Sequence, residues 1–401
     1  MRARERELIR QLRSDWPEPD PAAIETSLAL IERIAAAITA EGGSIGFDRY
    51  MSMALYEPGL GYYSAGMARF GAGGDFITAP LVSSLFSRTL ARQSAECLRA
   101  LGGGDILELG AGTGSMAADV LTELGNLGQP PERYLILEVS AALRQQQRET
   151  LAERAPQWLE RVQWLDRLPE RPIRGVLLAN EVIDALPVQR FRIASEGVRE
   201  LRVCWEGERF GWCERETGAV TAAVDALRRA LPAPLPTDYV SELCPSLAPW
   251  LASLADALAA GVMFFLDYGY PRHEYYHPQR SMGTLICHYR HRAHPDPLIL
   301  PGLQDITAFV DFTAVAEAGA AAGLQLLGFA PQAQFLMGAG LLELMQEAAS
   351  ADPKESMRLA QQVKALTMPG QMGERFKVLA LGRDYEAALR GFAYADHRGR
   401  L

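Results

Sequence analysis

The sequence predicts an α/β protein of the Rossmann-like, doubly wound type, built on a seven-stranded, mostly parallel sheet. An apolar run over 105–109 leads directly into glycines at positions 110, 112 and 114, and helical apolar spacing follows over 115–124. Further apolar strand candidates alternate with helical segments, which is typical of a parallel sheet covered by helices on both faces. With 401 residues, the chain is long enough for this sheet and for added segments.

The segment before the glycine loop is predicted to be mostly helical. Apolar residues recur with helical spacing over 22–42, and Gly42-Gly43 supplies a stop signal. The stretches 56–63 and 71–80 are rich in glycine, aromatic residues and proline, which suits loops that close over a ligand but also suits ordinary surface turns. We assign residues 1–95 to an N-terminal helical and lid region.

Residues 96–187 and 261–385 are assigned to the core that contains the sheet. The strands expected there are 105–110, 134–139, 161–165, 175–180 and 262–268, and a late antiparallel pair is expected at 325–336 and 374–382. A helical region at 339–366 separates the last two strands.

Residues 188–260 are assigned to an inserted α+β subdomain that contacts a substrate or partner. Short strands are expected over 188–212 around the turn at 206–209, and helices are expected near 219–230 and 246–260.

Composition excludes several classes of protein. The net charge of −9 and the pI near 5.4 oppose broad binding to nucleic acid. The longest strongly apolar run, 262–266, is too short to insert in a membrane. The N-terminus mixes acids with its arginines and lacks an apolar segment, so neither a secretory nor a typical organellar signal is expected, and the five cysteines form no C-x-x-C pair. These features predict a cytoplasmic protein with reduced thiols.

Three histidines spaced three apart, at positions 288, 291 and 294, raise the question of a metal site. Arginines alternate with these histidines and would repel a cation, and two prolines close behind indicate a loop. We therefore predict no metal, and expect contact with substrate or polar packing instead.

The glycine loop predicts a nucleoside cofactor. Gly110, Gly112 and Gly114 allow the backbone to approach a ligand where a Cβ atom would collide. A dinucleotide fingerprint would place a glycine at position 115, where the chain has Ser115. Glu108, close to the loop, disfavours a pyrophosphate and matches a cationic, phosphate-free ligand such as S-adenosyl-L-methionine (SAM). A glycine-rich turn without a ligand is the alternative.

Glu138 ends the second strand candidate, where a carboxylate can accept hydrogen bonds from both ribose hydroxyls of an adenosine. Dinucleotide and SAM folds share this feature, so Glu138 supports adenosine and not SAM alone. An exposed acid at a strand end, or a helix cap, is the other interpretation.

After the fourth strand candidate, Asn180, Glu181 and Asp184 place an amide and two carboxylates at the edge of the sheet where ligands bind. Glu181 or Asp184 could hold a cationic acceptor such as an arginine or lysine side chain through charge-assisted hydrogen bonds. Ordinary capping of a helix by Asn180 or Asp184 is the alternative.

A set of motifs, taken together, is more specific than the glycine loop alone. They are Tyr56 to Tyr63, Gly74-Asp-Phe-Ile-Thr-Ala-Pro80, Glu108 to Gly114, Asn180-Glu-Val-Ile-Asp-Ala-Leu-Pro187, Asp267-Tyr-Gly269, and Gln304-Asp-Ile-Thr307 with Val310-Asp-Phe312. With these motifs the chain resembles the MidA family, whose members have the class I SAM-dependent methyltransferase fold. The family's mitochondrial member is an arginine methyltransferase that acts on a subunit of respiratory complex I.

The resemblance implies which residues contact the cofactor and the acceptor. Those implied to contact SAM are Gly74, Asp75, Thr78, Gly110, Gly112, Gly114, Glu138 and Asn180, and Glu108 is added because its negative charge beside the loop matches a cationic ligand. Trp164, Leu165 and Asp166 are expected to border the adenine, and Glu181 and Asp184 are expected to lie nearest the acceptor. The sequence departs from many relatives at Leu81, where they carry Glu, and at Phe309, where they carry His.

The function predicted from these features is in-line methyl transfer from SAM to a protein side chain, most plausibly arginine, with S-adenosyl-L-homocysteine as product. A non-catalytic assembly or scaffold protein that binds a respiratory or other partner is the alternative. A small-molecule methyltransferase and a dehydrogenase rank lower.

Overall fold

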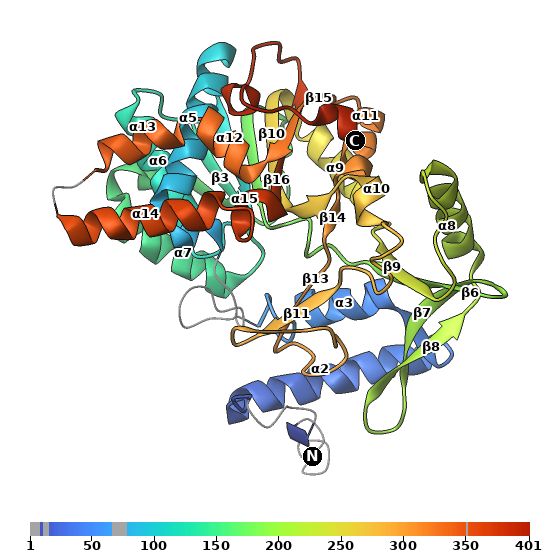
Figure 1. Cartoon of the computed structure of the whole chain (residues 1–401). Helices are drawn as coiled ribbons and strands as arrows, with labels where there is room; N and C mark the ends of the chain where they lie inside the picture. Colours follow the sequence, from blue (N-terminus) through green and yellow to red (C-terminus); the bar gives the residue numbers. More distant parts are fainter. Residues whose placement is uncertain (1–8, 11–15, 66–77, 350–351) are drawn as a thin grey trace. The chain divides into compact units, whose positions relative to one another are not determined.

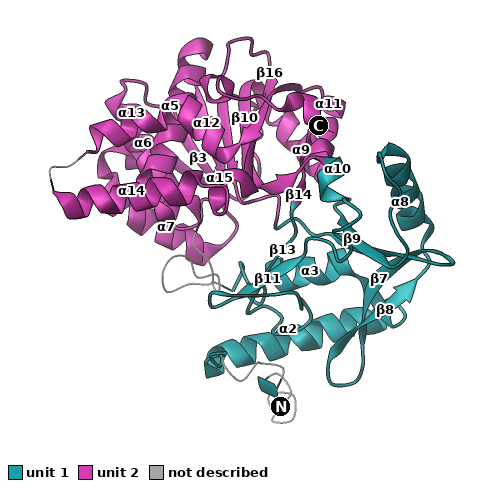
Figure 2. Ribbon diagram, viewed as in Figure 1, with its two compact units in different colours: residues 1–76, 185–246, 272–309 teal, residues 77–184, 247–271, 310–401 magenta. Residues whose placement is uncertain are grey.

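The computed structural model describes residues 9–10, 16–65, 78–349 and 352–401, and the chain forms two compact units. Unit 1 comprises Met1–Phe76, Ala185–Ser246 and Arg272–Phe309, and unit 2 comprises Ile77–Asp184, Leu247–Pro271 and Val310–Leu401 (Figure 2). Residues 272–309, which the sequence placed in the core, thus belong to unit 1. Residues 247–260, which the sequence placed in the insertion, belong to unit 2.

Unit 2 contains the large sheet, with the strand order β15-β16-β10-β5-β2-β3-β4. Its strands are β2 (Asp105–Leu109), β3 (Tyr134–Leu137), β4 (Val162–Leu165), β5 (Ile173–Asn180), β10 (Leu258–Tyr270), β15 (Gln325–Pro331) and β16 (Phe376–Arg383). The short strand β14 (Val310–Asp311) also pairs with β10, so the described sheet has eight strands where seven were expected.

Strand directions confirm the predicted mostly parallel sheet. From β4 to β10, neighbouring strands run parallel, whereas β16 is antiparallel to both β10 and β15. The parallel strands are joined through helices, as a parallel pair requires. Their carboxyl ends consequently meet at one edge of the sheet.

Helices cover both faces of this sheet (Figure 1). They are α4 (Ala79–Val82), α5 (Ser84–Leu101), α6 (Ser115–Asn126), α7 (Ala141–Arg154), α9 (Leu247–Asp256), α11 (Phe312–Ala321), α12 (Gln332–Gly338), α13 (Leu341–Glu347), α14 (Pro353–Thr367) and α15 (Met372–Arg375), with short 3-10 turns at Pro156–Arg161, Arg390–Phe392 and Arg398–Arg400. Successive side chains of β10 point to opposite faces. Phe264 contacts Phe335 of α12, and Phe265 contacts Trp250 of α9.

Element boundaries differ from the prediction where a buried strand or a turn overrides helical spacing. The helix expected over 246–260 ends at Asp256, because Leu258 already begins the buried strand β10. The strand expected over 325–336 ends at Pro331, and the helical region over 339–366 is divided into α13 and α14. Within the part of the chain described, no helix is long and apolar enough to cross a membrane.

Unit 1 combines helices with two small antiparallel sheets. Its helices are α2 (Pro21–Ala40), α3 (Phe47–Tyr56), α8 (Gly218–Ala230) and α10 (Arg272–Tyr275). One sheet holds β1 (Ser44–Gly46), β6 (Gln189–Ala194), β7 (Gly197–Trp205), β8 (Phe210–Arg215) and β9 (Tyr239–Leu243), and the other holds β11 (Ile286–Tyr289), β12 (Arg292–His294) and β13 (Asp305–Thr307). Asp20 caps α2 by accepting a hydrogen bond of 2.9 Å from the amide of Ala23. An apolar core with Phe47, Tyr50 and Phe210 joins these segments.

Gly175 provides a test of the packing in the large sheet. It lies in β5 between β2 and β10 with φ of +153°, and an added Cβ would overlap the carbonyl oxygen of Asp105. We expect Gly175→Ala to lower the free energy of unfolding by about 3 kcal/mol or more, measured by urea denaturation. Gly197→Ala is the matched control, because Gly197 has φ of +135° but no atom within 4 Å of the added Cβ. Equal losses in the two variants would contradict this packing.

Candidate active site

The glycine loop follows β2 at the carboxyl edge of the sheet. Gly110, Gly112 and Gly114 have φ of 61°, 50° and 82°, in the left-handed region that favours glycine. Gly114 also begins α6, where an added Cβ would lie 3.0 Å from the Cα of Gln147. The chain therefore needs a glycine at position 114 both for its backbone angles and for close packing against α7.

Glu108 lies inside the sheet, directly before this loop. Its side chain is buried, and Oε2 accepts a hydrogen bond of 2.6 Å from the hydroxyl of Tyr134. Burial raises the pKa of Glu108 to about 7, and the carboxylate of Glu138 adds to the effect. The carboxyl that the sequence argument treated as a fixed negative charge is therefore partly protonated near neutral pH.

Glu138 follows β3 and is held in place by its surroundings. Oε1 accepts from the amide of Ser140 at 2.8 Å, and Oε2 accepts from Nε2 of Gln147 at 3.1 Å. Burial raises the pKa of Glu138, while these hydrogen bonds and Arg144 act in the opposite direction. Ser140, and not Glu138, caps α7 with its side chain.

Gln147 is a site residue that the sequence did not reveal. It is fully buried, and its Nε2 donates both to Glu138 and to the carbonyl oxygen of Gly112 at 3.0 Å. Its Oε1 accepts a 2.9 Å hydrogen bond from Nε1 of Trp164. One amide thus ties together the loops that follow β2 and β3 and the end of β4. The available signal was a glutamine within the apolar stripe of α7, between Leu143 and Leu151.

The residues expected to border adenine lie at the end of β4 and just after it. Arg144 joins this segment to the end of β3, because it donates to the carbonyl oxygens of Glu138 at 2.6 Å and Leu165 at 2.8 Å. Arg144 also pairs with the exposed Asp166 at 2.5 Å. The guanidinium of Arg148 lies 4.8 Å from the centre of the Trp164 ring. Trp164, Leu165 and Asp166 therefore lie beside Glu138, and their contact with adenine stays a prediction.

Val139 is a second residue that the sequence did not reveal. It directly follows Glu138, and 69% of its surface is exposed, which is unusual for an apolar side chain at the end of a buried strand. It provides an apolar surface next to the carboxylate assigned to the ribose.

Asn180 and Glu181 form the turn at the carboxyl end of β5. Glu181 has φ of 53°, a left-handed conformation that is uncommon for a residue other than glycine. Its Oε1 accepts from Nδ2 of Asn180 at 3.1 Å, and its Oε2 accepts from the hydroxyl of Tyr268 at 3.0 Å. Strained residues held by several contacts are concentrated at functional sites, and Glu181 has this character.

Asp267, at the end of β10, fixes the segment that carries Asp184. Its Oδ2 accepts from the amides of Ile183 at 3.0 Å and Asp184 at 3.2 Å. Burial raises the pKa of Asp267 to about 8, and the nearby carboxylate of Glu181 adds to the effect. Asp184 is itself buried. Both predicted acceptor residues thus lie in one turn that is anchored to β10.

One atom in this turn indicates a missing partner. The side-chain oxygen Oδ1 of Asn180 is buried and accepts no hydrogen bond from the described residues. A buried acceptor of this kind normally has a partner, and an ammonium or hydroxyl group of a ligand would provide one. With Glu138 and the glycine loop at the same sheet edge, the residues present fit an amino-acid nucleoside such as SAM.

The other residues singled out from the sequence are Gly74, Asp75, Thr78, Leu81 and Phe309. Gly74 and Asp75 lie outside the described residues. Thr78 precedes the short helix α4, and its side chain does not cap that helix. Leu81 lies in α4 of unit 2 and Phe309 in unit 1, where its amide donates to Oγ1 of Thr284 at 3.0 Å.

The histidine-rich segment forms a β-hairpin of β11 and β12, in which His288 pairs with Ala293. Within the described ranges, no group of three or more His, Cys, Asp or Glu side chains is arranged to hold a metal ion.

Comparisons with known proteins agree on one family. Residues 89–330 match the family model described as "Putative S-adenosyl-L-methionine-dependent methyltransferase". A mitochondrial protein arginine methyltransferase, NDUFAF7 of Danio rerio, is 30% identical over 400 residues that cover 91% of this chain and 90% of that protein. The Homo sapiens protein of the same name is 29% identical, covering 84% of this chain and 80% of that protein.

A solved structure from Burkholderia thailandensis, a likely methyl transferase bound to S-adenosyl-homocysteine, is 43% identical to the chain with a TM-score of 0.92. The match covers 96% of this chain and all of that one. These findings confirm the predicted fold class and cofactor. The predicted cytoplasmic location is contradicted, because the curated relatives are named as mitochondrial proteins.

The raised pKa of Glu108 predicts a pH-dependent stability. The carboxyl has its ordinary pKa of 4.5 in the unfolded chain and about 7 in the folded protein, so stability falls as pH rises through this window, by on the order of 3 kcal/mol. Glu108→Gln cannot ionise and can still accept from Tyr134. Its stability relative to the wild type should therefore increase between pH 5 and pH 8, measured by urea denaturation. A difference that does not change with pH would contradict the burial of a protonated Glu108.

Proposed function

Because the chain belongs to the MidA family of SAM-dependent methyltransferases, we propose that it methylates arginine side chains of a protein substrate. The family and the cofactor are shown by the matches above, and the arginine acceptor is inferred from the curated relatives named protein arginine methyltransferase. The observation that carries the proposal is the carboxylate of Glu181, held in a strained turn next to Oδ1 of Asn180, a buried atom that accepts no hydrogen bond from the described residues.

Two sets of residues are proposed to act at the sheet edge: one set binds the cofactor, and the other binds the acceptor. The loop of Gly110 and Gly112 is proposed to let the backbone approach the nucleoside, and Glu138 is proposed to accept from its ribose hydroxyls. Oδ1 of Asn180 is proposed to accept from the ammonium group of the methionine moiety. SAM, when bound, supplies an electrophilic methyl group on a positively charged sulfur.

Glu181 is proposed to bind the acceptor. A carboxylate oxygen carries more than one lone pair, so Oε1 and Oε2 can accept from a guanidinium while keeping their bonds to Asn180 and Tyr268. Charge-assisted hydrogen bonds from two N–H groups would fix the plane of the guanidinium and localise its charge away from the nitrogen that is methylated. The proton lost from that nitrogen passes to a carboxylate or to water.

Tyr268 is proposed to be a positioning residue for Glu181. Its hydroxyl donates to Oε2 of Glu181, and its ring packs against Phe376 with centroids 4.5 Å apart. The adjacent Asp267 holds the amides of Ile183 and Asp184. These contacts restrict the carboxylate to one orientation, which lowers the entropic cost of binding an acceptor productively.

A subunit of a respiratory complex is proposed as the protein substrate. The resemblance to the MidA family implies such a subunit, and the animal relatives are named as mitochondrial proteins. Incubating the protein with methyl-labelled SAM and solubilised respiratory complexes tests the proposal. Label recovered as methylarginine after acid hydrolysis supports it, whereas label only in methyl-lysine or in small molecules would replace arginine with another acceptor.

Substitution of Glu181 should separate catalysis from cofactor binding. We expect Glu181→Gln to slow methyl transfer by about a hundredfold, because the neutral amide binds a guanidinium poorly, while SAM affinity stays within about twofold. Tyr268→Phe, which frees the carboxylate to rotate, should slow transfer by about tenfold. Single-turnover transfer and calorimetry with SAM measure the two effects. Unchanged rates in Glu181→Gln, compared with Glu160→Gln, would remove Glu181 from the mechanism.

Substitution of Gln147 should weaken cofactor binding, whereas substitution of Glu181 should leave cofactor binding unchanged. We expect Gln147→Leu to weaken SAM binding by about tenfold or more, because Glu138, Trp164 and the Gly112 carbonyl each lose a hydrogen bond. Calorimetry measures this loss. Gln145→Leu on the exposed side of the same helix is the control and should bind SAM as the wild type does. Equal affinity in the two variants would show that Gln147 does not organise the cofactor site.

A further inference from the structure

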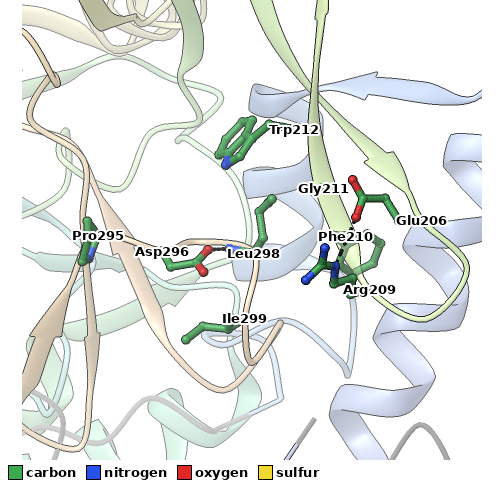
Figure 3. Close-up of a pocket in the computed structure, with 9 residues that line it drawn as sticks. All are labelled: Glu206, Arg209, Phe210, Gly211, Trp212, Pro295, Asp296, Leu298 and Ile299. Atoms are coloured by element: carbon green, nitrogen blue, oxygen red, sulfur yellow. Dashed lines mark hydrogen bonds and ion pairs between the residues drawn. The ribbon is translucent and has the colours of Figure 1, made fainter. Parts of the chain in front are cut away.

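Unit 1 contains a groove that the proposed catalytic residues do not use. It has a volume of about 530 Å³ and lies between the β7–β8 hairpin and the loop 295–299 (Figure 3). Its lining residues are Glu206, Arg209, Phe210, Gly211, Trp212, Pro295, Asp296, Leu298 and Ile299. This volume is in the range of known ligand sites.

One wall of the groove is the edge strand β8, whose single partner among the described strands is β7. The amide of Glu206 donates to the carbonyl of Arg209 at 2.9 Å, so these two residues form a hydrogen-bonded pair. Hydrogen-bonded and non-hydrogen-bonded pairs alternate along an antiparallel hairpin, and Phe210, Trp212 and Glu214 therefore lie in non-hydrogen-bonded pairs. Their main-chain N–H and C=O groups point away from β7. Among the described residues, none hydrogen-bonds to these outward main-chain groups. Such an edge is a template for one more strand.

The main chain of β8 is anchored to the core of unit 1 by the buried Phe210 and the half-buried Trp212. Phe210 contacts Tyr50 at 5.5 Å between ring centroids, and Trp212 contacts Phe47 at 5.2 Å. The guanidinium of Arg190 lies 4.9 Å from the Trp212 ring. The edge therefore keeps its shape without a partner.

The opposite wall, the loop 295–299, is also fixed in advance. Nε2 of the fully buried Gln304 donates to the carbonyls of Asp296, Pro297 and Ile299 at 3.3, 3.2 and 2.6 Å. The hydroxyl of Tyr50 donates to Pro297 at 2.9 Å. Because the walls are already ordered, less conformational entropy of the protein is lost when a ligand binds between them. Gln304, the first residue of the motif Gln304-Asp-Ile-Thr307, thus holds the loop that forms this wall.

The charges of the groove favour a basic occupant. Glu206 is paired with Arg209 at 3.1 Å, which balances both charges. Asp296 is exposed, its Oδ1 accepts from the amide of Leu298 at 3.0 Å, and it has no cationic partner among the described residues. An unpaired carboxylate beside an open strand edge suits an extended segment that carries an arginine or lysine.

We propose that this groove docks an extended, basic segment of the protein substrate, which adds to β8 as a further strand and pairs a cationic side chain with Asp296. The proposal rests on the proposed function for the existence of a protein substrate. Main-chain pairing gives such a site affinity without strict sequence requirement, and the carboxylate adds a preference for charge.

Fluorescein-labelled nonapeptides of alternating threonine and valine test the docking by fluorescence anisotropy. One has a central arginine, one a central glutamate, and a third has the arginine but N-methylated amides along one edge. We expect Asp296→Lys to weaken binding of the arginine peptide by about fivefold and to favour the glutamate peptide instead. The N-methylated peptide should bind about tenfold more weakly to the wild type.

Glu208→Lys is the matched control, because Glu208 is exposed in the same hairpin turn but does not line the groove. It should leave the affinity for all three peptides within about twofold of the wild type. Identical affinities in Asp296→Lys and Glu208→Lys, or no effect of N-methylation, would overturn the docking. Sedimentation of the wild type as a dimer that Glu214→Pro dissociates would also overturn it, by assigning the β8 edge to a second copy.

Calorimetry with SAM and methyl transfer, measured on the same variants, keep this proposal separate from the proposed function. Charge-dependent peptide binding in a protein that labels no arginine would support the groove and contradict arginine methylation. Arginine labelling whose KM is the same in Asp296→Lys and in the wild type would support the function and contradict the groove.

Discussion

Parallel pairing of the central strands is the constraint on which the candidate site depends. Because β2, β3, β4, β5 and β10 run in the same direction, the segments that follow them meet at one edge of the sheet. The glycine loop, Glu138, Trp164 and the turn at Glu181 come from distant parts of the chain and share no local motif. Gln147 then fixes three of these segments relative to each other with a single side-chain amide.

Burial gives the carboxyl groups at this edge different roles. Glu108 is enclosed in the sheet, where burial raises its pKa to about 7. Its side chain accepts a hydrogen bond from the hydroxyl of Tyr134 inside the protein. Asp267 is also buried, and its contacts are to backbone amides that hold the active-site turn. Glu181 is only half-buried, and its two oxygens are oriented by neighbouring side chains. The carboxylate suited to binding an acceptor is thus the one that remains accessible.

Unit 1 shows how a second structure is built from three separated parts of the chain. Residues 185–246 and 272–309, which lie before and after β10 in the chain, join the N-terminal helices in one apolar core. A hairpin and a loop from two of these parts form the walls of the groove, each fixed by buried side chains. Cofactor binding and the proposed docking of a protein segment would then depend on different residues.

The sequence by itself determined the class of fold, the strands of the large sheet, the glycine loop and the acids at its edge. Apolar periodicity and glycine spacing are local properties, so they can be read from neighbouring residues. Tertiary structure alone decided the roles of Gln147, Asp267 and Gln304, the strained backbone of Glu181, and the grouping of residues 272–309 with unit 1. Each of these depends on contacts between residues far apart in the chain. Sequence periodicity does not indicate which residue a buried polar side chain will contact.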